Sequence, residues 1–298
     1  NLKVALLDQN YQILYKNFYK TQNLKTKKKI IDKIQESIQD IICNKKIARD
    51  KLLGIGMGVP GPVDYEKGKV YFFPNIPGWK KVRLKTILEK KIKLPVFVDN
   101  DANLMCLAEA RIGAAKKSKN AVCLTLGTGV GGGIIINQQL YRGSNSVAGE
   151  IGHLPLNEEG EHCRCGGKAC LERYVGNRAI LRHASQFFNR AITLEELSSL
   201  AKRGNKKAQG LWYNVGVKLG IALSGVVNLL NPDCIVMGGG VAEAGKFLFQ
   251  GIRDTIERRA MPIQAKKVRI LRAQLGPDAG LIGAGILLKE SLKSWKYL

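Results

Sequence analysis

The chain has 298 residues, of which 45% are hydrophobic and 24% charged, so it can bury a sizeable core in about two domains. This composition excludes collagen, coiled coil and wholesale disorder. Lys and Arg number 48 against 24 Asp and Glu, a formal net charge of +24, which can mark a nucleic-acid or membrane-surface binder. Because the basic residues are spread widely, we interpret them as a solvated surface that suits anionic ligands such as nucleotides.

No segment has the layout of a membrane span or an export signal. The uncharged stretch 120–141 contains five glycines, which favour a strand–turn–strand over a membrane helix. The start, Asn1–Val4, lacks the basic and apolar regions of a signal peptide. Isolated cysteines in regular segments are typical of reduced, buried thiols; they are Cys43, Cys106, Cys123 and Cys234. We therefore expect a cytoplasmic protein with no membrane or nucleic-acid partner.

Strands and helices alternate along the chain. In the first half, hydrophobic periodicity predicts strands at 3–8, 12–19, 52–59 and 95–99, and helices at 26–43 and 103–113. In the second half it predicts strands at 121–126, 132–136, 234–237 and 268–273, and helices at 206–230, 244–259 and 279–293. This alternation is typical of an α/β protein. Because both halves open with a strand pair, we expect two related lobes with a cleft between them.

One histidine and three closely spaced cysteines form the clearest metal signal. His153 precedes Cys163, Cys165 and Cys170, and a Cys₃His set suits tetrahedral, structural zinc. Three cysteines within eight residues are seldom chance in a reduced protein, although buried thiols are the alternative. His162 is a rival ligand to His153.

Two glycine-rich segments follow buried strands. The first contains Gly127, Thr128, Gly129, Gly131 and Gly132; the second is Gly238, Gly239 and Gly240. Glycines allow backbone N–H groups to approach a phosphate, and strand ends are where nucleotides bind in α/β folds. Ordinary tight turns explain either segment equally well. The first is neither a Walker loop nor a dinucleotide fingerprint, because a strand follows it.

Polar residues at a strand end could act on a substrate. Asn100 and Asp101 lie between the strand at 95–99 and a helix. Asp99, Asn100 or Asp101 could simply cap that helix, but a carboxylate there could also accept a proton from an alcohol that attacks a phosphoryl group. Glu150 and Glu172 flank the metal ligands, where they would suit a polyol.

These motifs together resemble the ROK family of bacterial sugar kinases and sugar-responsive repressors. The resemblance covers essentially the whole chain and several motifs in register; they are Val98–Asn103, Leu126–Gly133, Gly149–His153, the cysteine cluster ending at Glu172, Asn231–Asp233 with Gly238–Gly240, and Leu275–Gly283. It implies a two-lobed, actin-like, hexokinase-type fold that closes over a sugar and Mg-ATP. The lobes would be residues 1–108, with the helix at 279–298 packing back onto them, and residues 109–278, with a zinc module at 153–172.

The resemblance also implies a role for each motif. Asp101 would be the general base toward a sugar hydroxyl, and the sugar would be held by Asn100, Glu150, His153 and Glu172, with His153 also on zinc. The segment from Gly127 to Gly132 would be a phosphate loop, and Gly238–Gly240 would face the adenosine. A homodimer is expected from the family alone.

The chain departs from the family pattern in two places. Ala169 stands where the family usually has glycine, which would cost about 1 kcal/mol if that position needs positive φ. The family also begins with an Asp-x-Gly-Gly-Thr phosphate loop, whereas this sequence starts just after the matching position. Because every later motif is intact, we expect a truncated sequence rather than a pseudoenzyme.

The leading hypothesis is therefore an ATP-dependent hexose kinase, specifically a glucokinase. The preference for glucose rests on similarity to the glucokinase branch at Gly149–His153 and Pro74–Trp79. The alternatives are an N-acetylglucosamine or N-acetylmannosamine kinase, a repressor whose DNA-binding domain is missing from this chain, and a non-catalytic sugar-binding protein. ATP and polyphosphate both remain candidates for the phosphoryl donor.

Overall fold

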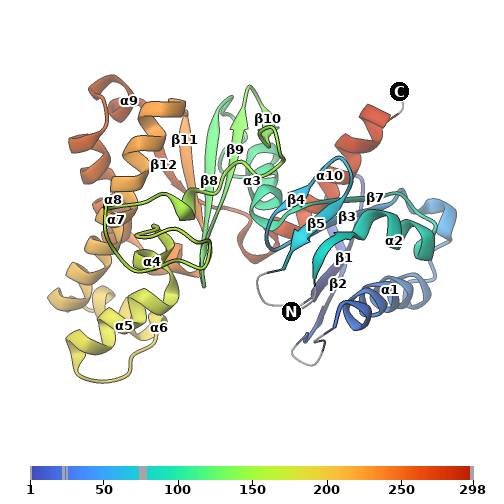
Figure 1. The fold of residues 1–298 in the computed structure, drawn as a ribbon, viewed down its shortest axis with the longest axis horizontal. Coiled ribbons are helices and arrows are strands. Elements are labelled where there is room, and N and C mark those ends of the chain that lie inside the picture. Colours follow the sequence, from blue (N-terminus) through green and yellow to red (C-terminus); the bar gives the residue numbers. More distant parts are fainter. Residues whose placement is uncertain (1, 22–23, 25, 74–78, 296–298) are drawn as a thin grey trace. The chain divides into compact units, whose positions relative to one another are not determined.

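The computed structural model describes residues 2–21, 24, 26–73 and 79–295. The chain divides into two compact units (Figure 1). Unit 1 comprises Asn1–Ala108, Arg142–Ala148 and Pro277–Leu298, and unit 2 comprises Glu109–Tyr141 and Gly149–Gly276. The chain therefore passes between the units at four points. The segment Pro74–Gly78, part of the similarity to glucokinases, lies outside the described residues.

The described residues of unit 1 form three small sheets. An antiparallel hairpin pairs β1 (Leu2–Leu7) with β2 (Ile13–Tyr19). In the second sheet, β3 (Ile55–Val59) runs parallel to β7 (Val96–Asn100). The third is an antiparallel meander of β4 (Val63–Asp64), β5 (Lys69–Phe72) and β6 (Lys80–Arg83).

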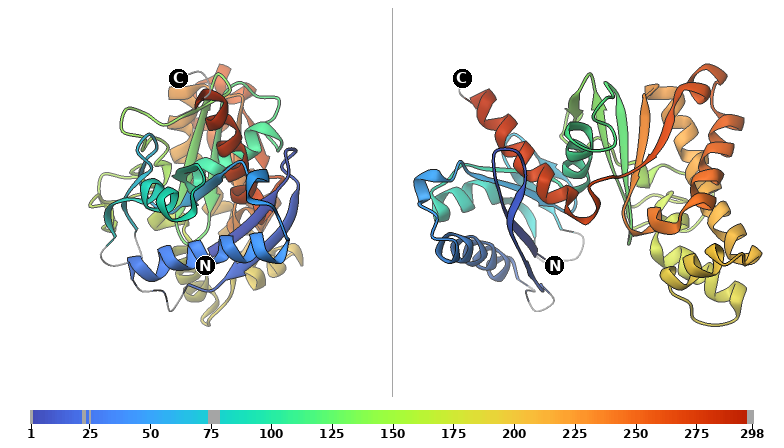
Figure 2. Two further views of the ribbon diagram at one scale, coloured as in Figure 1. Left: turned by 90° about the vertical axis from the view of Figure 1, so that its right-hand side faces the viewer. Right: turned by 180° about the vertical axis from the view of Figure 1, so that it is seen from behind.

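The described part of unit 1 also contains four α-helices, three of which pack on these sheets. They are α1 (Lys27–Asn44), α2 (Leu84–Ile92), α3 (Asp101–Arg111, whose last turn belongs to unit 2) and α10 (Ala279–Trp295), with a 3₁₀ turn, η1 (Arg49–Lys51). The hydroxyl of Thr26 caps α1 by accepting the N–H of Lys29. Isoleucines of α1 and leucines of α2 enter one core with Val96 and Val98 of β7. Helix α10 packs on β1 and β3 (Figure 2).

Unit 2 is built on one mixed sheet of order β10-β9-β8-β11-β12. Its strands are β8 (Ala121–Leu126), β9 (Val130–Ile136), β10 (Gln139–Tyr141), β11 (Cys234–Gly238) and β12 (Arg269–Arg272). The strands β8, β11 and β12 are parallel neighbours, whereas β9 and β10 return antiparallel. Every residue of β11 is buried, as expected for a central parallel strand.

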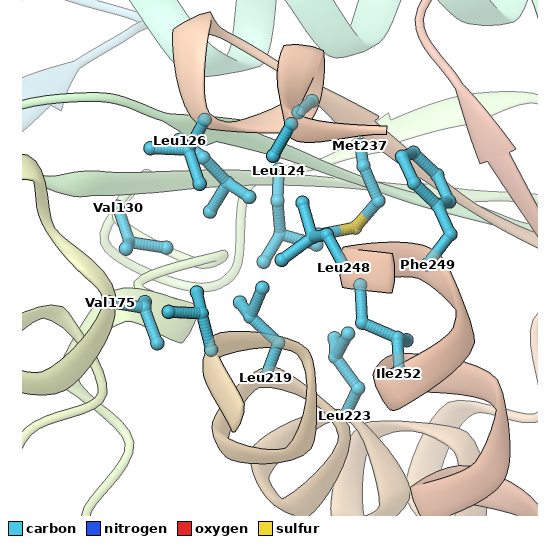
Figure 3. Packing of buried hydrophobic residues seen from close by; sticks show 14 of the residues in the cluster. Leu124, Leu126, Val130, Val175, Leu219, Leu223, Met237, Leu248, Phe249 and Ile252 are labelled. Atoms are coloured by element: carbon cyan, nitrogen blue, oxygen red, sulfur yellow. The ribbon is translucent and has the colours of Figure 1, made fainter. Parts of the chain in front are cut away.

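The helices of unit 2 cover this sheet. They are α4 (Glu172–Val175), α5 (Asn177–Phe188), α6 (Leu194–Lys202), α7 (Lys206–Leu230), α8 (Lys246–Arg259) and α9 (Pro262–Lys267), with 3₁₀ turns η2 (Ile151–His153), η3 (Gly240–Ala244) and η4 (Gly276–Asp278). Side chains of α7 and α8 meet those of β8 and β11 in the main core (Figure 3). The two helices approach closely, since a Cβ on Gly216 would lie 2.2 Å from the carbonyl oxygen of Leu248.

Among the described residues, α7 is the one helix that is long and apolar enough to cross a membrane. Half of its most apolar window is buried, and its buried residues belong to the core of unit 2. In this structure α7 is a core helix.

Candidate active site and metal centre

Four potential metal ligands converge in unit 2, one at the end of η2 and three in the segment between η2 and α4. The ligand atoms of His153, Cys163, Cys165 and Cys170 all lie within 4.8 Å of one another. Cys163 Sγ is 3.6 Å from His153 Nδ1, and Cys165 Sγ is 3.6 Å from Cys170 Sγ. Tetrahedral zinc, with bonds of about 2.3 Å to sulfur and about 2.0 Å to nitrogen, requires ligand separations of roughly 3.5–3.8 Å. These two distances match a tetrahedral ion, and one imidazole with three thiols is a donor set that suits zinc.

Backbone hydrogen bonds shape the turn that carries the thiols. The N–H of Cys163 donates to the carbonyl of Gly167 at 2.8 Å, and that of Gly166 donates to the carbonyl of Cys163 at 3.1 Å. Gly166 has φ +97°, a value that favours glycine. His162 is exposed and lies outside the ligand cluster, so the histidine that joins the cysteines is His153.

The thiols differ in their electrostatic surroundings. Burial, together with the neighbouring thiols of Cys165 and Cys163, raises the pKa of Cys170 to about 12. A hydrogen bond from the N–H of Gly167 lowers the pKa of Cys165. Zinc binds the thiolate form of cysteine, so a zinc ion in this site would displace the thiol protons of the three cysteines.

His153 connects the ligand cluster to two carboxylates. Its Nδ1 faces Cys163, and its Nε2 lies 3.8 Å from Glu150 Oε2, so a metal on Nδ1 would leave Nε2–H directed toward a carboxylate. Glu172 Oε1 lies 3.9 Å from Cys163 Sγ, and its Oε2 accepts the N–H of Val130 at 3.2 Å. The structure thus gathers Glu150, His153 and Glu172.

Of these two carboxylates, that of Glu150 is the more exposed. About half of its side chain is exposed. Partial burial raises the pKa of this carboxyl; the carboxylate of Glu172 raises it further, whereas His153 lowers it. A carboxylate in these surroundings is a ready acceptor for a hydroxyl donor.

The two glycine segments lie together at the carboxyl ends of the neighbouring parallel strands β8 and β11. Gly239 has φ +84°, and a Cβ there would lie 2.2 Å from the carbonyl oxygen of Leu126. On the β8 side, the N–H of Asn177 at the start of α5 donates to the carbonyl of Gly127 at 2.9 Å. Thr128, the residue after Gly127, is exposed. This is the sheet edge at which α/β proteins bind nucleotides.

Other glycines of the first segment have packing reasons. A Cβ on Gly129 would lie 2.2 Å from Glu172 Oε2. Gly131 and Gly132 lie within β9, opposite Thr125 and Leu124. A Cβ on Gly132 would lie 2.3 Å from the carbonyl oxygen of Gly149. Close packing against backbone therefore explains glycine at position 132, and the role of the segment toward a nucleotide stays a prediction.

In unit 1, Asn100 and Asp101 lie where β7 meets α3. Asn100 caps the helix, because its Oδ1 accepts the N–H of Ala102 at 2.8 Å and that of Asn103 at 3.3 Å. Its Nδ2 donates to the carbonyl of Gly61 at 3.1 Å. Asp101 is exposed and accepts the N–H of Ala102 at 2.9 Å. Capping thus belongs mainly to Asn100, and Asp101 presents an accessible carboxylate.

Sequence reasoning missed one residue beside this strand end. Arg142 donates from Nε to Asp99 Oδ2 at 2.8 Å although the two residues are 43 positions apart. A lone arginine after a short strand carries no spacing signal that could have revealed this pairing.

The comparison with known families settles what kind of protein these motifs belong to. The ROK family matches residues 1–291. The chain belongs to the ROK family. A glucokinase of Halalkalibacterium halodurans is 36% identical over 280 residues, covering 89% of this chain and 84% of that enzyme. A xylose repressor of Bacillus spizizenii is 32% identical over 239 residues, covering 80% of this chain and 62% of the repressor.

Solved ROK structures have the same fold. A ROK family glucokinase from Streptomyces griseus, solved in complex with glucose and AMPPNP, superposes with a TM-score of 0.82 at 31% identity, covering 96% of this chain and 95% of that chain. A ROK hexokinase from Thermus thermophilus superposes with a TM-score of 0.80 at 30% identity, covering 98% and 100%. The predicted family and its actin-like α/β fold are confirmed.

Proposed function

We propose that this ROK protein is an ATP-dependent hexose kinase that converts glucose to glucose 6-phosphate. The observation that carries the proposal is Asp101, an exposed carboxylate at the end of β7 beside the capping residue Asn100. A protein that only binds sugar needs hydrogen-bond partners, whereas phosphoryl transfer also needs a base. The glucokinase similarity supports this choice.

The proposed chemistry assigns one task to each group. Asp101 accepts the proton of the attacking sugar hydroxyl as the new O–P bond forms and the bond to the leaving ADP breaks. As in the family pattern, Asn100, Glu150, His153 and Glu172 would hold the other hydroxyls. Charged and amide partners suit this task, since each hydroxyl can both donate and accept.

Zinc would organise the segment of unit 2 that carries His153 and Glu172. Held by His153, Cys163, Cys165 and Cys170, a structural ion would fix the segment that leads from His153 to Glu172. The cytoplasm, a reducing compartment, would keep the three thiols available.

The nucleotide would occupy the edge at β8 and β11. Backbone N–H groups of the segment from Gly127 to Gly132, with the Thr128 hydroxyl, would contact phosphates, and Gly238–Gly240 would lie against the adenosine. Mg²⁺ would enter with ATP as part of the substrate and neutralise charge on the phosphates.

A coupled ADP-release assay with Mg-ATP tests the proposal. The sugars tested are glucose, N-acetylglucosamine, N-acetylmannosamine and xylose, and polyphosphate is tested as a second phosphoryl donor. Two forms of the protein are assayed, one with and one without an Asp-x-Gly-Gly-Thr segment ahead of Asn1. We expect the highest kcat/KM with glucose and ATP. A kcat/KM for N-acetylglucosamine ten times that for glucose would show that N-acetylglucosamine is the substrate. If neither form of the protein phosphorylates any of these sugars, the kinase proposal is rejected.

A sugar-responsive repressor is the second candidate, favoured by the xylose repressor relatives. A DNA mobility shift that weakens with salt and responds to sugar would support it. Light scattering would test the homodimer expected from the family.

A further inference from the structure

A buried carboxylate beside the proposed base has no part in the chemistry above. The side chain of Asp99 is 1% exposed. Its Oδ1 accepts the N–H of Asn100 at 2.7 Å and Nδ2 of Asn103 at 2.9 Å, and its Oδ2 accepts Nε of Arg142 at 2.8 Å. A buried charge is tolerated when it is paired and hydrogen-bonded in this way.

Arg142 is held from its other side by an aromatic ring. Its guanidinium lies 3.7 Å from the centroid of the Tyr65 ring. The hydroxyl of Ser291 in α10 donates to the carbonyl of Leu287 at 2.7 Å, so in the 2.9 Å contact between the Tyr65 and Ser291 hydroxyls the donor is Tyr65. The ring is thereby fixed, and the arginine lies between a carboxylate and an anchored aromatic face, a geometry that lysine cannot reproduce.

The backbone of Arg142 opens a short closed loop. The N–H of Ala148 donates to the carbonyl of Arg142 at 2.9 Å. Residues 142–148 belong to unit 1, although Tyr141 before them and Gly149 after them belong to unit 2. The arginine therefore anchors the loop 142–148 to the strand end that presents Asn100 and Asp101.

We propose that Arg142 is a positioning residue for phosphoryl transfer. Arg142 holds the carboxylate of Asp99 against the N–H of Asn100. It thereby fixes the peptide group between Asp99 and Asn100, and with it the backbone that carries Asn100 and Asp101. Loss of the guanidinium would leave Asp99 buried without its countercharge, and the carboxylate would turn toward water and release that peptide. This inference rests on the proposed kinase function, since the atoms being positioned are those of the proposed base and sugar ligand.

The test compares Arg142→Gln, Arg142→Lys and the double variant Asp99→Asn/Arg142→Gln with the parent protein. Arg190→Gln is the matched control, because Arg190 pairs with Glu196 on the surface of unit 2. We expect Arg142→Gln to lower kcat/KM for the sugar about 100-fold, the loss expected from misplacing a reacting group by about 1 Å. In the same variant, KM for ATP should change less than twofold. Arg142→Lys should restore less than a tenth of the kcat/KM that Arg142→Gln loses, and Arg190→Gln should have the kcat/KM of the parent.

Amide hydrogen exchange provides a readout that does not depend on activity. The amides of Asn100, Ala102 and Asn103 should exchange at least tenfold faster in Arg142→Gln and at the parent rate in Arg190→Gln. If the parent transfers no phosphate to any sugar, the kinase proposal fails while this comparison still decides the positioning role.

The double variant keeps the test decisive if Arg142→Gln fails to fold. It removes both charges, so no unpaired charge is buried, and we expect it to fold with kcat/KM at least tenfold below the parent. The inference is overturned if any folded variant lacking the guanidinium shows parental kcat/KM or parental exchange at Asn100.

Discussion

The carboxylate of Glu109 accepts the N–H of Leu275 at 2.8 Å, across 166 positions of sequence. The same oxygen accepts the N–H of Gln274 at 2.9 Å, and the other accepts that of Ala114 at 2.7 Å. Glu109 is fully buried. The chain passes from one unit to the other at Ala108/Glu109 and again at Gly276/Pro277. The carboxylate of Glu109 therefore fixes the backbone next to both of these crossing points.

Glu109→Gln should destabilise the protein by about 1–3 kcal/mol, the range for a buried donor left without its acceptor. An amide has one oxygen, so its NH₂ group must face either Ala114 or the pair Gln274 and Leu275. Urea unfolding measures the change. Glu257→Gln, an exposed glutamate of α8, is the control and should stay within about 0.5 kcal/mol. Equal midpoints for the two variants would show that the carboxylate is dispensable.

Zinc should couple stability to sugar affinity. We expect Cys165→Ser to bind less zinc, to melt at lower temperature and to bind sugar more weakly, because the ion orders the segment that carries His153 and leads to Glu172. Elemental analysis, thermal melts and calorimetric sugar titration measure these effects.

The matched control for zinc is Cys43→Ser, since Cys43 is an exposed free cysteine in α1 of unit 1. It should behave as the parent. A Cys165→Ser variant with the parental melting temperature, and a parent that contains no metal, would reject the structural zinc.

Ala169 adopts φ +52° and is fully buried, so the position where the family usually has glycine does require a left-handed backbone. Ala169→Gly would stabilise the folded protein by relieving a backbone strain of about 1–2 kcal/mol. The same substitution would destabilise it by removing a buried methyl, worth about 0.8 kcal/mol. It would also give the unfolded chain more conformational freedom, which costs about 0.4–1 kcal/mol more. These terms nearly cancel, so we expect a net change of at most about 0.8 kcal/mol in either direction.

Ala184→Gly is the control for that substitution. Ala184 is also fully buried, but within the regular helix α5, where glycine costs about 1 kcal/mol in propensity besides the lost methyl. Equal losses of unfolding free energy in the two variants would contradict the strain at Ala169.

Strongly periodic segments were predicted closely from sequence. The limits of β8 and α7 agree with the structure at both ends, because a continuous apolar run and a clear stop at Asn231 define them. The strand predicted at 52–59 begins only at Ile55, after Gly54 at φ +153°. Weak signals were missed: β4 has two residues, and α5 buries mainly small alanines.

The site was predictable only in part. Local spacing identified the four potential metal ligands that the structure brings together, and the family resemblance supplied roles for Asp101 and Glu150. Residue patterns alone could not separate a phosphate loop from a tight turn at Gly127–Gly132. The pairs Arg142–Asp99 and Glu109–Leu275 join distant segments, and such contacts depend on tertiary packing that periodicity does not encode.

The most direct test of the central claim is the turnover of Asp101→Asn in the coupled ADP assay with glucose and Mg-ATP. Asp50→Asn, an exposed aspartate of η1, is the control. Removal of a general base should lower kcat by about 10²–10⁴, with the melting temperature and glucose Kd near those of the parent and the control fully active. An Asp101→Asn protein that phosphorylates glucose at the parental rate would contradict the account.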